Sequence, residues 1–154
     1  MREILFRGKT LSNESEWVEG FYNHIPCGRF QRDEHCIQTI NEDGRIGQLY
    51  NVYENTVGQF TGLTDKNGKK IFEGDLLNGF SYPYYRSEED THNYFAEVVW
   101  FDGNCAFGLV THKHPTSTVR GISDGNADFI EGFDTDDWEI IGNIHDNPEL
   151  LEGA

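Results

Sequence analysis

The sequence predicts a mainly β protein built from short strands and tight turns. Three observations indicate this class: 17 glycines in 154 residues, repeated Asn-Gly and Asp-Gly pairs, and an aromatic content of 14%. Glycine and Asn-Gly or Asp-Gly pairs reverse the chain, and aromatic side chains suit strands and bury large areas. A chain of this length removes about 70% of its extended surface from water on folding. We therefore expect one domain spanning residues 1–154.

The first third of the chain contains two predicted pairs of strands. Residues 4–7 and 17–22 form the first pair, with a polar turn at residues 12–15 between them. Residues 36–40 and 48–53 form the second, because a turn-rich connection separates two segments rich in β-branched and aromatic residues.

The middle of the chain gives the clearest local prediction. Residues 61–64 and 69–72 flank Asp65-Lys66-Asn67-Gly68, in which Asn and Gly tolerate a positive φ and permit a tight reversal. Another strand is expected to follow at residues 73–77. Residues 81–93 are polar and aromatic without a period, which predicts a long exposed loop.

The last third begins with a strong hairpin. Residues 94–101 and 105–110 are apolar on both strand faces, which predicts a central position in a sheet. From Thr111 to Asp137 the pattern weakens, and Gly125–Gly132 fits either a loop or one helical turn. Residues 138–144 read as the last strand.

A short terminal helix is expected after that strand. Asn147 and Pro148 are residue types that suit the N-cap and first positions of a helix, here Glu149–Leu151.

The net charge of −15 bears on the possible partners. Residues 114–154 hold 10 acidic residues and 1 basic residue, or −9 of that total. Such a field repels phosphate backbones, so direct binding of nucleic acid is disfavoured. Basic proteins, metal ions, or surfaces that normally hold DNA are the better electrostatic match, although solubility alone also explains an acidic surface.

The sequence predicts a cytoplasmic protein with no membrane contact. It has no run of the roughly 18 to 20 apolar residues that a span needs, and no hydrophobic leader at its start. The odd and sparse set of Cys27, Cys36 and Cys105 is unlike a disulfide framework, so reduced thiols are expected.

His24, Cys27, His35 and Cys36 lie in one short segment and supply imidazole and thiolate groups, which in principle bind zinc. Their spacing is poor: His35 and Cys36 are adjacent and would point to opposite faces of a strand. We therefore predict ordinary strand residues here and no metal site.

Other constellations also have plainer explanations. His112 and His114 share one face of an extended segment, but a solvated loop accounts for them. Residues 124–128 have the spacing that opens a calcium loop, yet Phe129 and Thr135 stand where the required Gly and Glu belong. A nearby acidic group could hold a weak divalent ion but needs none: Asp134, Asp136 and Asp137.

Catalytic motifs are missing from the sequence. Ser and Cys nucleophile motifs and phosphate-binding glycine loops do not occur, and Glu73 with Asp75 reads as a surface carboxylate pair. We predict no catalytic residues and no cofactor.

Three blocks of the chain resemble the YopX family of phage and prophage proteins. They are residues 57–76, residues 138–151, and the opening at residues 6–9 with 17–20, and the resemblance spans the whole chain. His145 departs from the family pattern, in which Tyr is commoner. Signature positions that the resemblance picks out, with turn or folding roles expected, are Gly58, Thr61, Gly62, Asp65, Asn67, Gly68, Glu73, Gly74, Asp75, Gly142, Asn143, Asn147 and Pro148.

The resemblance implies an SH3-like small barrel over about residues 56–147, an N-terminal β part over about 1–55, and a helical turn at 148–152. It implies that the protein is located in the cytoplasm of a bacterial host, and it does not point to any particular biochemical activity. We expect a non-enzymatic accessory protein that binds a host or phage protein, or a second copy of itself through strand edges or apolar patches. The alternatives are an acidic DNA mimic or another nucleic-acid-related role, and a metal-dependent hydrolase.

Overall fold

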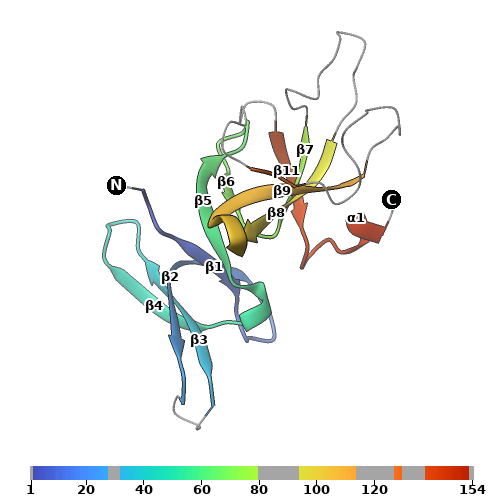
Figure 1. The fold of residues 1–154 in the computed structure, drawn as a ribbon. Coiled ribbons are helices and arrows are strands. Elements are labelled where there is room, and N and C mark those ends of the chain that lie inside the picture. The colour runs from blue at the N-terminus through green and yellow to red at the C-terminus, as the bar shows by residue number, and fades with distance from the viewer. Residues whose placement is uncertain (1, 28–31, 80–93, 114–126, 130–137, 153–154) are drawn as a thin grey trace, which may run out of the picture. The chain divides into compact units, whose positions relative to one another are not determined.

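A computed structural model describes residues 2–27, 32–79, 94–113, 127–129 and 138–152 (Figure 1). Its elements in chain order are β1 (Phe6–Lys9), β2 (Trp17–Ile25), β3 (Glu34–Ile40), β4 (Ile46–Asn51), η1 (Glu54–Thr56), β5 (Gly58–Thr64), β6 (Lys70–Phe72), β7 (Asp75–Gly79), β8 (Tyr94–Phe101), η2 (Asp102–Asn104), β9 (Ala106–Lys113), β10 (Ala127–Phe129), β11 (Trp138–Asn143) and α1 (Glu149–Glu152). The predicted mainly β class is confirmed. None of the described helices is long and apolar enough to cross a membrane.

The strands form two sheets. One has the order β4-β3-β2-β1-β5-β6, and the other has the order β10-β9-β8-β7-β11. The chain divides into two compact units, residues 1–62 and residues 63–154.

The first unit is built on three antiparallel pairings of neighbouring strands. β1 pairs with β2 and β3 with β4, as the hairpin patterns predicted, and β2 also pairs with β3, which the sequence did not predict. Gly20 is required at the pairing of β2 with β3, because a Cβ there would lie 1.9 Å from the Gln38 carbonyl oxygen. Ile37 and Val52 are among the buried apolar residues of this unit, and a single bridge joins Thr10 to Val52.

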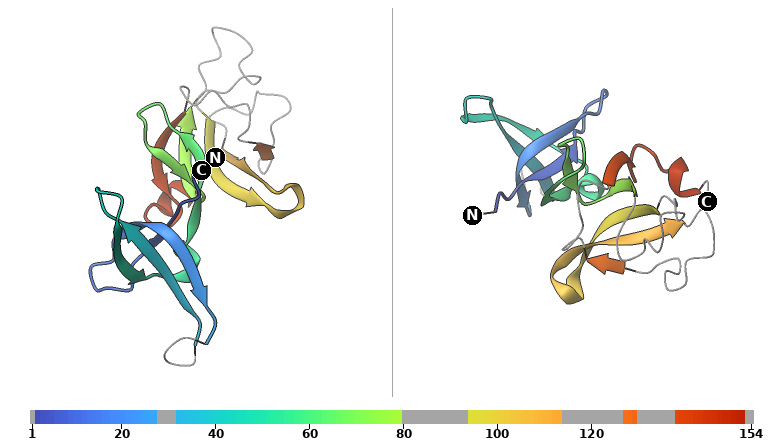
Figure 2. Two further views of the ribbon diagram at one scale, coloured as in Figure 1. Left: turned by 90° about the vertical axis from the view of Figure 1, so that its left-hand side faces the viewer. Right: turned by 90° about the horizontal axis from the view of Figure 1, so that it is seen from above.

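The second unit has its core on the strands of the five-stranded sheet and on β6. The buried cluster contains Ile71, Leu77, Ala96, Val98, Phe107, Leu109 and Trp138. The β8–β9 hairpin predicted as central lies between β7 and β10 (Figure 2). Alternate residues of β8 are buried because one face of the strand packs on this cluster.

The structure corrects several predictions. The described strands form two open sheets and no closed SH3-like barrel, because β5 and β6 extend the sheet of β1 while β7 to β11 form a sheet of their own. The first strand lies at residues 6–9, where it pairs with both β2 and β5. Part of the undecided segment, Ala127–Phe129, is strand β10 and neither loop nor helix. The loop expected at residues 81–93 lies outside the described residues.

Candidate functional site

Asp65 holds the turn between β5 and β6. Its side chain is buried, and Oδ1 accepts hydrogen bonds from the backbone N–H groups of Asn67 and Lys69, each at 2.9 Å. Oδ2 accepts the N–H of Ile140 in β11 at 3.0 Å. Burial, the largest influence, opposes ionisation of Asp65, but these N–H groups and the Lys69 charge outweigh it and lower its pKa. The carboxylate thus joins two signature blocks.

Gly74 and Asp75 form a second backbone junction. Gly74 has a φ of +87°, its N–H donates to the Val98 carbonyl at 2.8 Å, and its own carbonyl accepts the Ile144 N–H at 2.9 Å. Asp75 is fully buried and accepts the Phe72 N–H at 2.7 Å. Asp75 therefore does not form the surface carboxylate pair with Glu73 that the sequence suggested.

Asn143 and Asn147 shape the connection from β11 to α1. Oδ1 of Asn143 accepts the N–H groups of His145 and Asp146, at 3.0 and 2.9 Å. Asn147 was expected to cap the helix, but its Oδ1 accepts a hydrogen bond from the Asn143 N–H at 3.3 Å. Gly142 leaves room for that side chain, because a Cβ would lie 2.4 Å from the Asn147 oxygen.

The remaining signature residues lie on or near these strands and turns. Gly58 pairs with Arg7 of β1, Thr61 is buried, and Gly62 and Gly68 have φ values of +91° and +79°. Asn67 and Pro148 are exposed and Glu73 is half-buried. The signature residues thus lie mostly at turns and strand ends, where several bind the chain's own backbone.

An exposed apolar group lies in the first unit, on strands β2, β3 and β4. Phe21 and Leu49 are both paired with Gln38, so the three side chains share one face of the sheet. Ile40 lies two residues along β3 on the same face and is paired with Ile46. Their exposed fractions are 51% for Phe21, 51% for Leu49, 42% for Ile40 and 75% for Ile46. We call these four residues the β4 surface.

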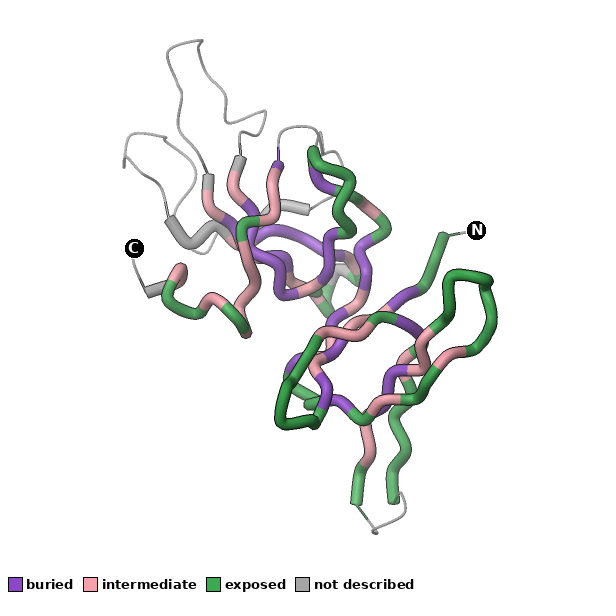
Figure 3. The backbone as a smooth tube through the Cα atoms, turned by 180° about the vertical axis from the view of Figure 1, so that it is seen from behind, coloured by how far each residue is buried: buried purple, intermediate pink, exposed green. Residues whose placement is uncertain are grey.

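Strand β4 is also an edge of its sheet. The Val52 N–H donates to the His35 carbonyl of β3 at 2.8 Å. Backbone groups alternate in direction along a strand, so the N–H and C=O of Leu49 point away from β3. The Asn51 carbonyl, which points the same way, accepts the Leu11 N–H at 3.0 Å. An open stretch of edge around Leu49 therefore lies beside the β4 surface. Figure 3 shows the neighbouring turn between β3 and β4, at the right of the view, as exposed.

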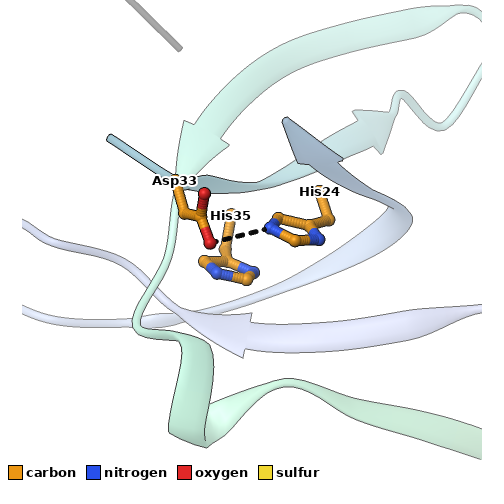
Figure 4. A group of neighbouring side chains, drawn as sticks. All are labelled: His24, Asp33 and His35. Carbon is orange, nitrogen blue, oxygen red and sulfur yellow. Dashed lines mark ion pairs between the residues drawn. The ribbon is translucent and has the colours of Figure 1, made fainter. Parts of the chain in front are cut away.

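A histidine cluster occupies the outer end of the β2–β3 hairpin. His24 and His35 are directly paired across the two strands, and their rings stack at 4.5 Å with an interplanar angle of 5°. Asp33 Oδ2 lies 3.3 Å from His24 Nε2 (Figure 4). One ligand atom from each of the three residues lies within 4.8 Å of the others.

Tyr22 and Glu54 complete the surroundings of His35. The Tyr22 hydroxyl lies 2.5 Å from His35 Nδ1, and Glu54 Oε2 lies 3.5 Å from His35 Nε2. Burial, then the charges of Glu54 and Cys36, raise the pKa of the Tyr22 phenol, so it is a neutral hydroxyl at physiological pH.

The cysteines of the weighed zinc set do not belong to this cluster. Cys36 is buried on the opposite face of β3 from His35, and its thiol lies 3.0 Å from Asn51 Oδ1. Cys27 is exposed in the following turn with a φ of +58°. The sequence did not indicate that two carboxylates lie beside these histidines. Asp33 belongs to the loop of the hairpin, and Glu54 belongs to η1, which is distant in the sequence.

Several weighed residues lie where the structure gives no side-chain description. His112 lies in β9 without a described side chain, and His114, Asp124, Asp134, Thr135, Asp136 and Asp137 lie outside the described residues.

A family model and a solved structure each match nearly the whole chain. No curated protein matches it. The crystal structure of protein EF1440 from Enterococcus faecalis is similar, with 22% sequence identity, a TM-score of 0.46, and coverage of 98% of this chain and 99% of that one. The sequence model of the YopX protein family matches residues 6–152, a range that contains the two signature blocks joined by Asp65 and all the strands described above. The chain therefore belongs to the YopX protein family.

Proposed function

We propose that this protein is a non-enzymatic accessory protein of a phage or prophage that acts by binding protein, and that its first partner is a second copy of itself. The β4 surface, beside the open edge at Leu49, is the observation that carries this proposal. An exposed strand edge pairs with another strand through backbone hydrogen bonds, and adjacent apolar side chains add burial.

A second copy fits this surface better than a strongly charged partner does. β4 carries no charged side chain, whereas the chain as a whole has a net charge of −15. Two copies repel one another through their general field, and a neutral strip is where they approach at the lowest electrostatic cost. Antiparallel pairing of β4 with β4 is self-complementary, so the assembly closes as a dimer with twofold symmetry.

The contribution of Leu49 to such a dimer follows from its exposure. Full burial of a leucine side chain stabilises by about 1.5 to 3 kcal/mol, so burying its exposed half contributes about 1 kcal/mol. The residue occurs twice in a symmetric dimer, which gives about 2 kcal/mol, or about a 30-fold change in dissociation constant. Leu49→Lys also places two like charges together, so this factor is a minimum.

Sedimentation equilibrium over a wide range of protein concentration tests the proposal. We expect a monomer–dimer equilibrium for the wild-type chain and a dissociation constant at least about 30-fold higher for Leu49→Lys. Ile46→Lys should weaken the dimer in the same direction, since Ile46 is the most exposed member of the surface.

Ile4→Lys is the matched control. Ile4 is 57% exposed but precedes β1 and lies outside the β4 surface, so its substitution should leave the association unchanged. Far-ultraviolet circular dichroism confirms that each variant is folded. A wild-type chain that is monomeric at the highest concentration, or an Ile4→Lys variant as weakened as Leu49→Lys, overturns self-association through this surface.

A further inference from the structure

We propose that His24, His35 and Asp33, whose ligand atoms lie within 4.8 Å of one another, form a binding site for a divalent transition-metal ion of the Zn²⁺ class, and that Glu54, which lies beside His35, turns in as a fourth donor. The cluster lies in the first unit and is independent of the dimer proposed above. Two imidazoles and two carboxylates are a donor set that zinc accepts.

The hairpin register brings the two histidines together. His24 and His35 are direct partners across β2 and β3, so the backbone hydrogen bonds of the sheet hold both Cβ atoms on the same face. Gly20, four residues before His24, lets the two strands approach closely. The pairing is therefore set by the fold and does not depend on an ion.

Two nitrogen-to-oxygen distances are close to the separation of neighbouring ligands in tetrahedral coordination. Two ligands that each lie about 2.0 to 2.1 Å from Zn²⁺ at the tetrahedral angle are about 3.3 to 3.4 Å apart. The pair His24 Nε2 and Asp33 Oδ2 is 3.3 Å apart, and the pair His35 Nε2 and Glu54 Oε2 is 3.5 Å apart. Each imidazole thus has a carboxylate at the separation of two ligands of one ion.

Tyr22 supports the ring-nitrogen assignment that a metal ion at His35 requires. Its hydroxyl lies at Nδ1, and a metal-binding histidine commonly donates its second ring N–H to such a group. With the proton on Nδ1, the lone pair of His35 lies on Nε2, the atom beside Glu54. The side chain of His35 is 10% exposed, so its orientation is held by packing as well.

Binding requires a movement of the other histidine. The two rings are nearly parallel, so their in-plane lone pairs do not converge on one point. The His24 side chain is 44% exposed and that of Asp33 is 61% exposed, and the terminal torsions of both residue types are broad. We infer that His24 and Asp33 turn onto an ion held first by His35.

The donor types select the ion. Imidazole suits Zn²⁺, Cu²⁺ and Ni²⁺, whereas Ca²⁺ and Mg²⁺ prefer oxygen ligands throughout. No step of bond breaking is assigned to the site, and an ion there would join β2, β3, the hairpin loop and η1.

Calorimetric titration of the full chain with Zn²⁺ tests the inference, and Co²⁺ supplies a visible spectrum that is intense for tetrahedral coordination. We expect one ion per chain at this site. His24→Ala should abolish it, and because His24 is exposed the variant should fold. Tyr22→Phe should keep all ligands and weaken binding by about 10- to 100-fold, the effect typical of losing an outer hydrogen bond.

Two control variants separate this site from other ligands in the chain. His145→Ala removes a histidine of the second unit, and Cys27→Ser removes the exposed thiol near the hairpin. Both should bind Zn²⁺ as the wild type does. Absence of Zn²⁺ binding, or binding that survives His24→Ala and is lost with either control, overturns the inference.

Discussion

Replacing Asp65 by Asn removes one charge and one acceptor from a junction of three backbone hydrogen bonds. The Asn side chain keeps one oxygen for the N–H groups of Asn67 and Lys69, and its NH₂ group faces the N–H of Ile140. A hydrogen bond to a charged group contributes about 1.5 to 3 kcal/mol to stability, and one between neutral groups contributes about 1 kcal/mol. A buried polar group left without a hydrogen bond costs about 1 to 3 kcal/mol. The loss in free energy of unfolding is therefore about 3 to 4 kcal/mol.

Urea unfolding, followed by tryptophan fluorescence and circular dichroism, measures this loss. A domain of this size is stable by about 5 to 15 kcal/mol, so Asp65→Asn should still fold. The matched control is Asp43→Asn. Asp43 also accepts a backbone N–H two residues on, that of Arg45 at 3.3 Å, but it lies on the exposed β3–β4 turn. Its substitution should cost under about 1 kcal/mol.

The pH dependence of the Asp65→Asn difference gives a second check. The pKa of Asp65 is lower in the folded chain than its ordinary value. The stabilisation is therefore fully present above the unfolded pKa of about 3.9 and is lost as the pH falls through the folded value. The difference between wild type and variant should be constant near neutral pH and shrink in acid. The stabilising role of the ionised Asp65 carboxylate is refuted if the two free energies of unfolding differ by less than about 1 kcal/mol at pH 7, or if their difference does not change in acid.

Two further predictions concern buried positions of the first unit. Gly20→Ala should lower the free energy of unfolding by about 3 kcal/mol or more, because its Cβ would overlap the rigid backbone at Gln38, whereas Gly103→Ala, with no atom within 4 Å, should be tolerated. Equal urea midpoints for the two variants would contradict this reasoning. Burial, then Glu34, raises the pKa of Cys36, so a thiol reagent should titrate the two exposed cysteines quickly and Cys36 only after unfolding. Rapid reaction of all three would refute it.

Local turn chemistry accounts for most of the fold that the sequence could predict. The hairpins of β3 with β4 and of β8 with β9 were predicted from strand-forming residues on either side of a turn. The limits of strands were less accurate. β2 was expected to end at residue 22 but extends to Ile25, because pairing with β3 outweighs the weak strand preference of polar residues.

Contacts between residues far apart in the chain could not be predicted. The Asp65 turn chemistry was recognised, yet its bond to Ile140 joins residues 75 apart. The expected closed barrel failed for the same reason: strand order depends on which edges meet, and local patterns do not encode it. His24 and His35 were recognised as possible ligands but rejected for their spacing, because the sequence does not show the hairpin register that pairs them or the approach of Asp33 and Glu54.

The signature residues and the candidate binding residues differ in where their polar groups are directed. The Asp65 carboxylate accepts three backbone N–H groups, and Asn143 and Asn147 likewise accept backbone N–H groups. Oxygens used in this way have little capacity left for a partner. At Leu49, by contrast, the backbone groups point outward beside exposed apolar side chains. Substitutions in the signature should therefore lower the free energy of unfolding while leaving the association of the folded chain intact. Substitutions in the β4 surface should weaken the association while leaving the free energy of unfolding nearly unchanged.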